Sequence, residues 1–562
     1  MTRITAIVIA VSLILFALFL LAPVLSAFAA DITVDTNCKL TDAINAANGD
    51  RASAGCAAGD GADTIRLTDN VTVDVPLPEI ESDITIEGNG HSVSGNSRYR
   101  ILRVSRQGRL ALNHVTLRDG YASQGGAIHN SGSVLIENGS FSKNQAYKNN
   151  GGAIYNTGQL TISGSVFLEN RADHFGDVTS SGGAIYNSGE DGEPGEVTIK
   201  NTAFVGNQAE FIGGAIANKD GKVAIFDSNF EKNSADASGG AVDSNGILSV
   251  SGSDFAGNFA NLGGAICTSI GVLEVSDSRF SANEADALGG AIMINTGEAS
   301  VIGSAFAGNS AETSGGAINN RNGALSISDS QFSGNAALYG GAISSRNDVS
   351  SEKARLSVAG SRFDANTADY GGAISGDGVQ SITASSFIAN TSAVFGGAIE
   401  SSASALLITD TTFSANKADH SGGGISLSTI VPARMTQLTV VNNAAGEGGG
   451  IHIYRKRGAE PAGELHNSLI AGNEGGDCSA AFSHHGANLI EDGACDAAIS
   501  GDPKLGTLIE PEDGSPAYFP LLPESPAIDA ADPEHCTATD QAGTARPGGV
   551  ACDIGAYEFP GE

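Results

Sequence analysis

The sequence predicts an all-β fold, a right-handed parallel β-helix in which short strands stack from coil to coil. A unit of about 26 residues recurs through residues 121–451, and a period of 20–50 residues is typical of solenoids and related arrays. Each unit opens with Gly-Gly-Ala-Ile or a close variant, as at Gly151–Ile154, and this motif occurs thirteen times. Eleven Phe-x-x-Asn motifs, such as Phe167–Asn170, alternate with the Gly-Gly motifs, and an alternating apolar triplet lies between the two.

One unit provides three predicted strands: the Ala-Ile-x-Asn segment, the triplet such as 160–162, and the residues around the Phe. Such strands cannot bury a face alone, so we expect identical units to stack at ~4.8 Å into three parallel sheets around one core. Ile154 and Asn156 should then point inward, with Ala153 and Tyr155 outward. Asn side chains can form amide ladders at the turns, and Gly-Gly gives the freedom that a tight corner needs.

The ends of the chain depart from the repeat. Residues 1–30 are typical of a signal peptide, with Arg3, a long apolar run and small residues before Ala30; an uncleaved anchor is the alternative. Residues 31–120 read as an N-terminal cap and irregular first coils, with a short amphipathic helix at 40–48 and Thr41 as a possible N-cap. Residues 452–562 read as the last coils and a C-terminal cap. No transmembrane segment is expected once the signal is cleaved.

Seven cysteines in an exported chain indicate disulfides with one cysteine left over. The local pairings place all three disulfides outside the regular array and leave Cys267 alone inside a repeat. Proximity alone suggests them, since a sequence does not fix connectivity. The candidate pairs are Cys38 with Cys56, Cys478 with Cys495, and Cys536 with Cys552.

Composition excludes several classes of function. The formal net charge of −33 argues against nucleic acid or an anionic membrane surface as a general partner. No tryptophan is present, which disfavours a broad aromatic platform for sugar rings. The histidines form no zinc-ligand pattern, and the glycines do not lead a strand into a helix as in a nucleotide-binding motif.

The residue after the Ile or Val of each Gly-Gly motif should be exposed. In the stacked coils these residues form one column along the rod, and few of them are charged. Its two carboxylates, Asp243 and Glu400, lie six coils apart, too far to share a metal or a substrate bond. The column six residues before each Phe holds one charge, Glu274. We therefore expect no catalytic and no cofactor-binding residue on these two faces. The first column is His129, Tyr155, Tyr186, Ala217, Asp243, Cys267, Met293, Asn319, Ser344, Ser375, Glu400, Ser426 and His452.

Acidic residues follow many of the Phe-x-x-Asn motifs at one corner. Adjacent coils should bring Glu210 near Asp236, and Asp286 near Glu312. Oxygen-rich sites suit calcium, so these four are weak candidates for Ca²⁺; a solvated acidic edge that keeps the rod soluble is the favoured interpretation. No other cofactor is expected.

Two clusters of basic residues occur in this acidic chain, one in the first coils and one at Arg455-Lys456-Arg457. Either could bind a polyanion such as an acidic glycan. The alternative is that both are ordinary surface charges. The first group is Arg98, Arg100, Arg103, Arg106 and Arg109.

The alternation of Gly-Gly-Ala-Ile and Phe-x-x-Asn over residues 121–451 resembles the repeats of chlamydial polymorphic outer membrane proteins. The segment 38–48 resembles the N-terminal Cys-Ser-Leu-Arg-Glu-Ala motif of exported bacterial β-helix proteins, and the tail from Ser525 to Glu558 is similar to a choice-of-anchor Q domain. The resemblance implies a secreted or cell-surface adhesin-like rod at the bacterial outer membrane.

We therefore expect an exported, monomeric protein that binds a glycan or a component of a host or neighbouring cell surface through its loops or one face. Enzymatic activity is not favoured. The alternative is a polysaccharide-active enzyme of the pectate-lyase-like class, since β-helices also host lyases and epimerases. A cleft that combines clustered carboxylates with a basic residue would separate the two.

Overall fold

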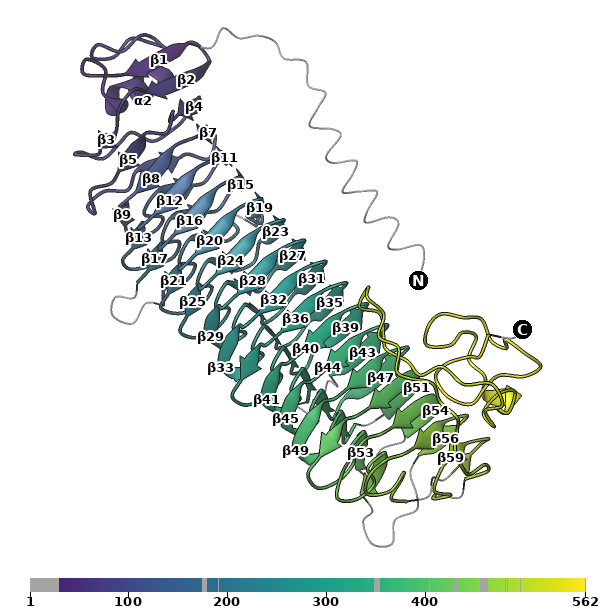
Figure 1. Ribbon diagram of the computed structural model, residues 1–562. Helices are drawn as coiled ribbons and strands as arrows, with labels where there is room; N and C mark the ends of the chain where they lie inside the picture. The colour runs from purple at the N-terminus through teal and green to yellow at the C-terminus, as the bar shows by residue number, and fades with distance from the viewer. Residues whose placement is uncertain are drawn as a thin grey trace.

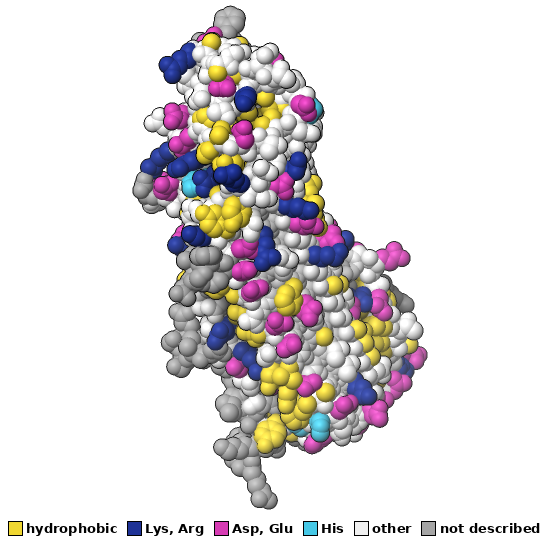
Figure 2. All heavy atoms as spheres, turned by 90° about the vertical axis from the view of Figure 1, so that its left-hand side faces the viewer, with side chains coloured by type: hydrophobic (Ala, Val, Ile, Leu, Met, Phe, Trp, Pro, Cys, Tyr) yellow, Lys and Arg dark blue, Asp and Glu magenta, His cyan; other side chains and the backbone are white. Residues whose placement is uncertain are grey.

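Parallel strands stacked into three long sheets form an elongated rod (Figures 1 and 2), as the repeat predicts. The computed structural model describes residues 30–173, 179–190, 192–347, 354–403, 405–428, 433–454, 463–480, 482, 484–495 and 497–560. The fold is a right-handed parallel β-helix with a single short α-helix among these residues. The expected signal segment before Ala30 and the Arg455–Arg457 group lie outside the described residues.

Each regular coil contributes four strands, one more than the sequence indicates. In one coil these are β22 (Ile216–Asn218), β23 (Lys222–Phe226), β24 (Asn229–Glu231) and β25 (Ser234–Ala235). Strands equivalent to β22 form a 14-stranded sheet, those equivalent to β25 form a 12-stranded sheet, and β23 and β24 belong to a broad 33-stranded sheet. The additional strand, as short as two residues, follows the Phe-x-x-Asn motif directly.

Helix α2 (Leu40–Asn48) lies at the N-terminal end of the rod against β1 (Asp31–Val34) and β2 (Ala62–Leu67), as Figure 1 shows. It buries one apolar face, which includes Leu40, Ile44 and Ala47, over the first coil. The helix predicted at residues 40–48 is confirmed, but Thr41 is not its N-cap. The helix starts at Leu40, so Lys39 occupies the cap position, and it makes no side-chain capping bond.

A buried ladder of asparagine side chains joins the coils along the rod. Asn283 is typical: its Nδ2 donates to Asn309 Oδ1 at 2.9 Å and to the carbonyl oxygen of Phe255 at 2.9 Å. Its own Oδ1 accepts from the backbone N–H of Asn258 at 3.0 Å. The ladder therefore gives hydrogen-bond partners to the asparagine amide and to backbone groups of the turn in each coil. Buried polar groups require such partners. Its members are Asn144, Asn170, Asn207, Asn233, Asn258, Asn283, Asn309, Asn335, Asn366, Asn390, Asn416, Asn443 and Asn473.

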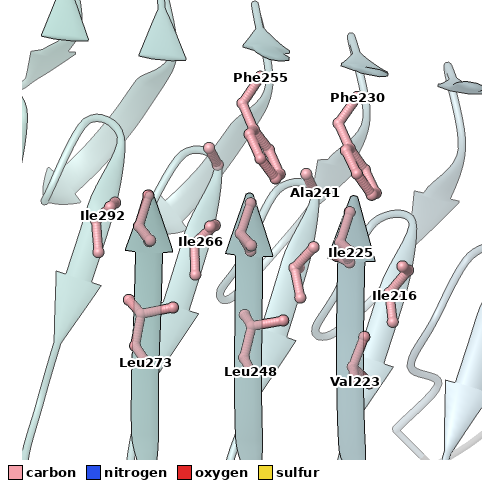
Figure 3. Packing of buried hydrophobic residues seen from close by; sticks show 14 of the residues in the cluster. Ile216, Val223, Ile225, Phe230, Ala241, Leu248, Phe255, Ile266, Leu273 and Ile292 are labelled. Carbon is pink, nitrogen blue, oxygen red and sulfur yellow. The ribbon is translucent and has the colours of Figure 1, made fainter. Parts of the chain in front are cut away.

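The core consists of aliphatic rows and one row of stacked phenylalanine rings (Figure 3). The ring centroids lie 4.6 Å apart at Phe141–Phe167 and 4.9 Å apart at Phe387–Phe413, close to the strand spacing. All eleven phenylalanines of this row, from Phe141 to Phe413, are fully buried. The inward positions that alternation predicts, such as Ile154 and Asn156, are likewise buried.

The Gly-Gly pair allows the coils to stack closely at one corner. Gly239 adopts φ +62°, a left-handed backbone conformation that glycine adopts without steric cost. At Gly240 a Cβ atom would collide with the carbonyl oxygen of Gly264 in the next coil. The first glycine therefore turns the chain, and the second makes room for the neighbouring backbone.

The C-terminal segment packs against the side of the rod, beside β51 (Ala405–Ser414) and β54 (Ala433–Val441), as Figure 1 shows. Buried Arg546 ties it down, with Glu558 at 2.9 Å and Asp410 of β51 at 3.4 Å. Ala517 donates its N–H to Ser386 Oγ at 3.0 Å, so the segment also reaches earlier coils. A second apolar cluster fills this contact.

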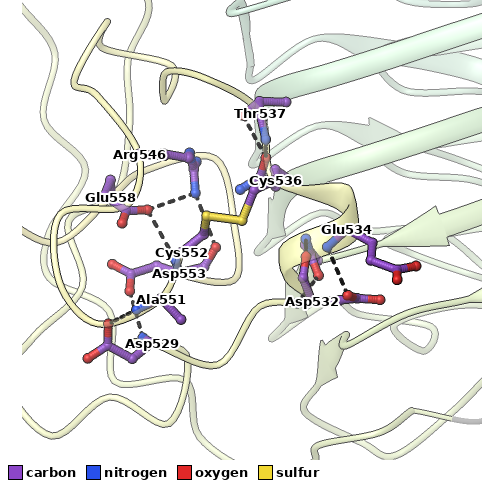
Figure 4. The surroundings of a disulfide bond; sticks show 12 residues. Asp529, Asp532, Glu534, Cys536, Thr537, Arg546, Ala551, Cys552, Asp553 and Glu558 are labelled. Atoms are coloured by element: carbon purple, nitrogen blue, oxygen red, sulfur yellow. Dashed lines mark hydrogen bonds and ion pairs between the residues drawn. A yellow bond between two sulfur atoms is a disulfide. The ribbon is translucent and has the colours of Figure 1, made fainter.

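The three disulfides are the pairs that sequence proximity suggests. Cys38–Cys56 joins the N-terminal cap, Cys478–Cys495 the last coils, and Cys536–Cys552 the C-terminal segment. Figure 4 shows the last of these beside the Arg546–Glu558 ion pair. Cys267 is free and buried.

We predict that Asn283→Ala destabilises the protein by about 3 kcal/mol, because it leaves the Asn258 N–H and the Phe255 carbonyl oxygen buried without partners. Chemical denaturation measures this as a lower unfolding midpoint. Asn261→Ala, at an exposed position of β29 (Phe259–Leu262), is the matched control and should leave the midpoint nearly unchanged. Equal midpoints for the two variants would contradict a stabilising role for the ladder.

Candidate functional site

The outer face of the 14-stranded sheet is largely covered, which corrects the expectation that its middle column is exposed. Asp243 and Cys267 are each 2 % exposed, and among the thirteen residues only His129, Tyr155 and Glu400 are half-buried. The Ala of the motif, expected to face outward, is buried as well, as at Ala153. Ser238, which precedes Gly239, lies over this face and donates its Oγ–H to Asp243 Oδ2 at 2.5 Å.

Asp243 and Cys267 form a buried polar pair on neighbouring strands β26 (Val242–Ser244) and β30 (Ile266–Thr268). Burial raises the pKa of Asp243 to about 6, although hydrogen bonds with Ser238 and Cys267 oppose the shift. Burial, together with the charge of Asp243, raises the pKa of the Cys267 thiol. A thiol without access to solvent and with a raised pKa is a poor nucleophile.

The broad sheet carries an open groove of about 470 Å³ along the rod axis. It crosses five coils, at β31 (Val272–Ser276), β35 (Glu298–Ile302), β39 (Ala324–Ser328), β43 (Arg355–Ala359) and β47 (Val379–Thr383). Its floor is the column expected to be outward. In register, this row is Glu274, Ser300, Ser326, Ser357 and Ser381.

A second row borders the groove and adds charge that the sequence interpretation overlooked. Glu298, Ala324 and Arg355 are register partners on successive strands, so the carboxylate and the guanidinium lie on either side of Ala324. Two coils separate them, roughly 10 Å at the sheet spacing. Glu274, Glu298 and Arg355 are all exposed. Val272 and Val379 continue the row at its two ends, so the border is apolar apart from one carboxylate and one guanidinium that can hydrogen-bond a ligand.

The groove has two carboxylates and one arginine, fewer than the three clustered carboxylates that would indicate a lyase-like cation site. Throughout the described part of the chain, no group of three or more His, Cys, Asp or Glu side chains could hold a metal ion.

The weak Ca²⁺ candidates lie along the 12-stranded sheet. Glu210, Asp236 and Glu312 each follow one of its strands directly, and Asp286 lies within β33 (Glu284–Leu288). Asp236, Asp286 and Glu312 are exposed. Glu210 accepts a hydrogen bond from Arg171 at 2.9 Å, so this carboxylate already has a cationic partner. The geometry is that of an acidic edge with one side chain per coil, and calcium binding there stays a hypothesis.

An aromatic and charged cluster near the C-terminal coils was not expected from the sequence. The Arg346 guanidinium lies 3.8 Å from the Tyr339 ring centroid and donates to Ser375 Oγ at 2.9 Å. Ser375 in turn donates to Glu400 Oε2 at 2.9 Å, and burial raises the pKa of Glu400. Tyr339 stacks on Tyr370 at 5.0 Å, which covers one face of each ring. An aromatic residue before Gly-Gly was the signal that could have found this cluster.

The five arginines of the first coils divide between two sides of the rod. Arg98 and Arg100 lie between β5 (Ser92–Ser94) and β6 (Leu102–Val104), and Arg103 lies within β6 of the 14-stranded sheet. Arg109 begins β7 (Arg109–Asn113) of the broad sheet. Arg106 lies in the connection between β6 and β7. The sequence interpretation had grouped all five together.

Fold and surface together define a β-helical repeat protein with an exposed groove. Two adjoining segments, residues 138–157 and 164–188, match the Chlamydia polymorphic membrane protein repeat. A comparison with curated proteins found no match. The repeat agrees with the resemblance drawn from the motifs and is typical of a surface protein of the outer membrane. Within the described residues, no helix has the length and apolar character needed to cross a membrane.

We predict that Asp243→Asn removes part of the pH dependence of stability. Because burial raises the pKa of Asp243 above its unfolded value, the carboxyl group favours folding most at low pH, and this contribution is lost as the pH rises from about 4 through about 6. The free energy of unfolding of the variant, relative to that of the wild type, should therefore be up to about 3 kcal/mol higher at pH 8 than at pH 4.

Denaturation midpoints of variant and wild type across this pH range measure the difference. Asp254→Asn, an exposed carboxylate on β28 (Asp254–Ala256), is the control and should show no such trend. A midpoint difference for Asp243→Asn that does not change with pH would contradict the assignment.

Proposed function

We propose that the protein is an exported, adhesin-like binding protein of the cell surface or extracellular space, and that the groove on the broad sheet holds an extended ligand such as a glycan chain. The observation that carries the proposal is the groove itself: about 470 Å³, open along the axis and crossing five coils in register. A linear polymer fits such a site better than a compact metabolite, because compact ligands occupy enclosed pockets.

The groove's chemistry supports a hydroxyl-rich ligand. Serine hydroxyls line the floor in four of the five coils, and each is both a donor and an acceptor. Glu298 and Arg355 add an acceptor and a donor fork at the border. The coil-to-coil repeat of these groups matches a ligand that is itself a repeating chain.

Export and surface location rest on several agreeing features. The chain forms three disulfides, which persist in oxidising compartments. Its repeats match a polymorphic membrane protein repeat, and its first residues are typical of a signal peptide. The likeness of the tail to a choice-of-anchor domain agrees with attachment to an envelope, and monomeric behaviour agrees with the large net charge.

A polysaccharide-active enzyme is the second candidate, and one observation favours it. Glu274, Glu298 and Arg355 border the same groove, so a sugar bound there would meet carboxylates and a guanidinium. Acid–base catalysis requires such groups within hydrogen-bonding reach of the reacting proton. Because these three side chains are spread over several coils, they are poorly placed to act on one proton, which disfavours the enzymatic candidate.

We predict that Ser326→Trp blocks the groove and lowers affinity for a bound glycan by about tenfold or more, since the indole fills the middle of the floor. A glycan array, followed by titration of any bound glycan, measures the effect. Thr161→Trp is the matched control: it occupies the same column six coils away, outside the groove. Equal loss in both variants, or no glycan or cell binding by the wild type, would refute the proposal.

The same preparation is tested for turnover of acidic polysaccharides with and without Ca²⁺, by reducing ends and unsaturated products. No turnover by the wild type agrees with a binding protein. Turnover that Glu298→Gln abolishes would replace the adhesin-like proposal with the enzymatic one.

A further inference from the structure

Positive charge on this acidic chain is concentrated in one short stretch. Residues 88–148, here called the basic belt, hold eight Lys or Arg and two Asp or Glu, whereas the whole chain has 30 and 63. Residues 31–87, which form the end of the rod, hold three Lys or Arg and twelve Asp or Glu. The belt is thus a positive band behind an acidic tip. Such an asymmetry indicates a charged partner.

Two arginines of the belt, Arg100 and Arg103, lie close enough together on one side of the rod for their charges to interact. Arg100 is half-buried and donates to the carbonyl oxygens of Gln124 at 2.7 Å and Gly125 at 3.2 Å. No carboxylate of the described residues forms an ion pair with it, and burial together with the charge of Arg103 lowers its pKa. Arg103 is the register partner of His129 and pairs with Glu79 at 3.2 Å. The charge is fixed in position but only partly neutralised.

Tyrosine rings hold the outer cations of the same side in place. The Arg98 guanidinium lies 5.2 Å from the Tyr99 ring centroid, and Lys148 Nζ lies 5.6 Å from that of Tyr147. Both distances are within the range of cation–π attraction. Tyr147 stacks on Tyr121 at 4.7 Å. Figure 2 shows many Lys and Arg side chains in the upper half of the face in view, with acidic and hydrophobic side chains among them.

We propose that the basic belt binds a chain of acidic sugars, carboxylated or sulfated, along the side formed by Arg98, Arg100, Arg103 and Lys148. Arginine forks match carboxylate and sulfate oxygens in geometry as well as charge. The site lies on a different side of the rod from the groove, so it does not rest on the groove's function.

The charge distribution selects a polysaccharide over two other polyanions. A flat anionic membrane that met the rod end-on would face the acidic tip formed by residues 31–87 before the belt. A nucleic acid duplex has a dense charge and a length that would bring it against the acidic coils on both sides of the belt. A flexible chain with one charge per sugar can follow the belt alone.

The test is titration of the purified protein with polygalacturonate (carboxylate), heparin (sulfate) and neutral dextran, at low and physiological ionic strength. The belt variant is Arg98→Glu/Arg103→Glu/Lys148→Glu. The control variant Lys232→Glu/Arg279→Glu/Lys417→Glu changes net charge equally at exposed positions outside the belt. We expect the belt variant to lose about tenfold or more in affinity for at least one acidic polymer, the control to stay within about twofold, and dextran not to bind.

Equal loss in both variants would show a general charge effect and overturn the site, as would dextran binding that matches the acidic polymers. Tighter binding to anionic vesicles or duplex DNA than to both polysaccharides would overturn the choice of ligand. The milder Arg98→Gln/Arg103→Gln variant keeps the side-chain bulk. It should unfold at the wild-type midpoint and show an intermediate loss, so impaired folding of the charge-reversal variant does not obscure the result.

Discussion

The structure depends on the hydrogen bond between one buried asparagine amide and the next. Each Nδ2 reaches the Oδ1 of the following coil at about 2.9 Å, as at Asn283–Asn309, and each Oδ1 also receives a backbone N–H from the preceding coil. These bonds form only if every coil returns to the same place one strand spacing further along. The ladder thus fixes the register that the phenylalanine stack and the aliphatic rows follow. The longer connection between β18 (Ile185–Asn187) and β19 (Glu196–Lys200) leaves the register of β19 with β15 (Gln159–Ser163) unchanged.

A fold built from one repeated register tends to give uniform outer faces, and function has to arise where the repeat varies. On the broad sheet, small serines in consecutive coils leave a groove, while Glu298 and Arg355 add charge at its border. In the first coils, Arg103 and Arg109 occupy outward positions that the next coil fills with His129 and Ser133. The inward positions cannot vary in this way, since a charged group there would lose its hydration without a partner.

The sequence was sufficient for the elements that depend on local pattern. Alternation placed Ile154 and Asn156 inside, helical spacing identified 40–48, and proximity suggested the disulfide pairs. Alternation tells which side of a strand a residue lies on, but not whether another segment covers that side. Asp243 was therefore expected in solvent, although Ser238 lies over it.

Other features were missed because they arise from contacts between coils. A strand of two residues such as β17 (Arg171–Ala172) carries no periodic signal of its own. Glu298 and Arg355 begin β35 and β43, and alternation within one strand does not indicate which charges of other coils lie beside them. The packing of Arg546 against Asp410 joins residues 136 positions apart, which no local pattern encodes.

The rod also determines how its two proposed sites relate to each other. The belt coil that contains β11 (Ser133–Glu137) and the first groove strand, β31, are five coils apart along the broad sheet, roughly 24 Å. Because stacked coils are stiff, this separation does not adapt to the ligand as a flexible linker would. One polymer can engage both sites only if it is long enough to pass from one side of the rod to the other. Longer chains would then gain affinity through effective concentration, and short fragments would bind each site separately.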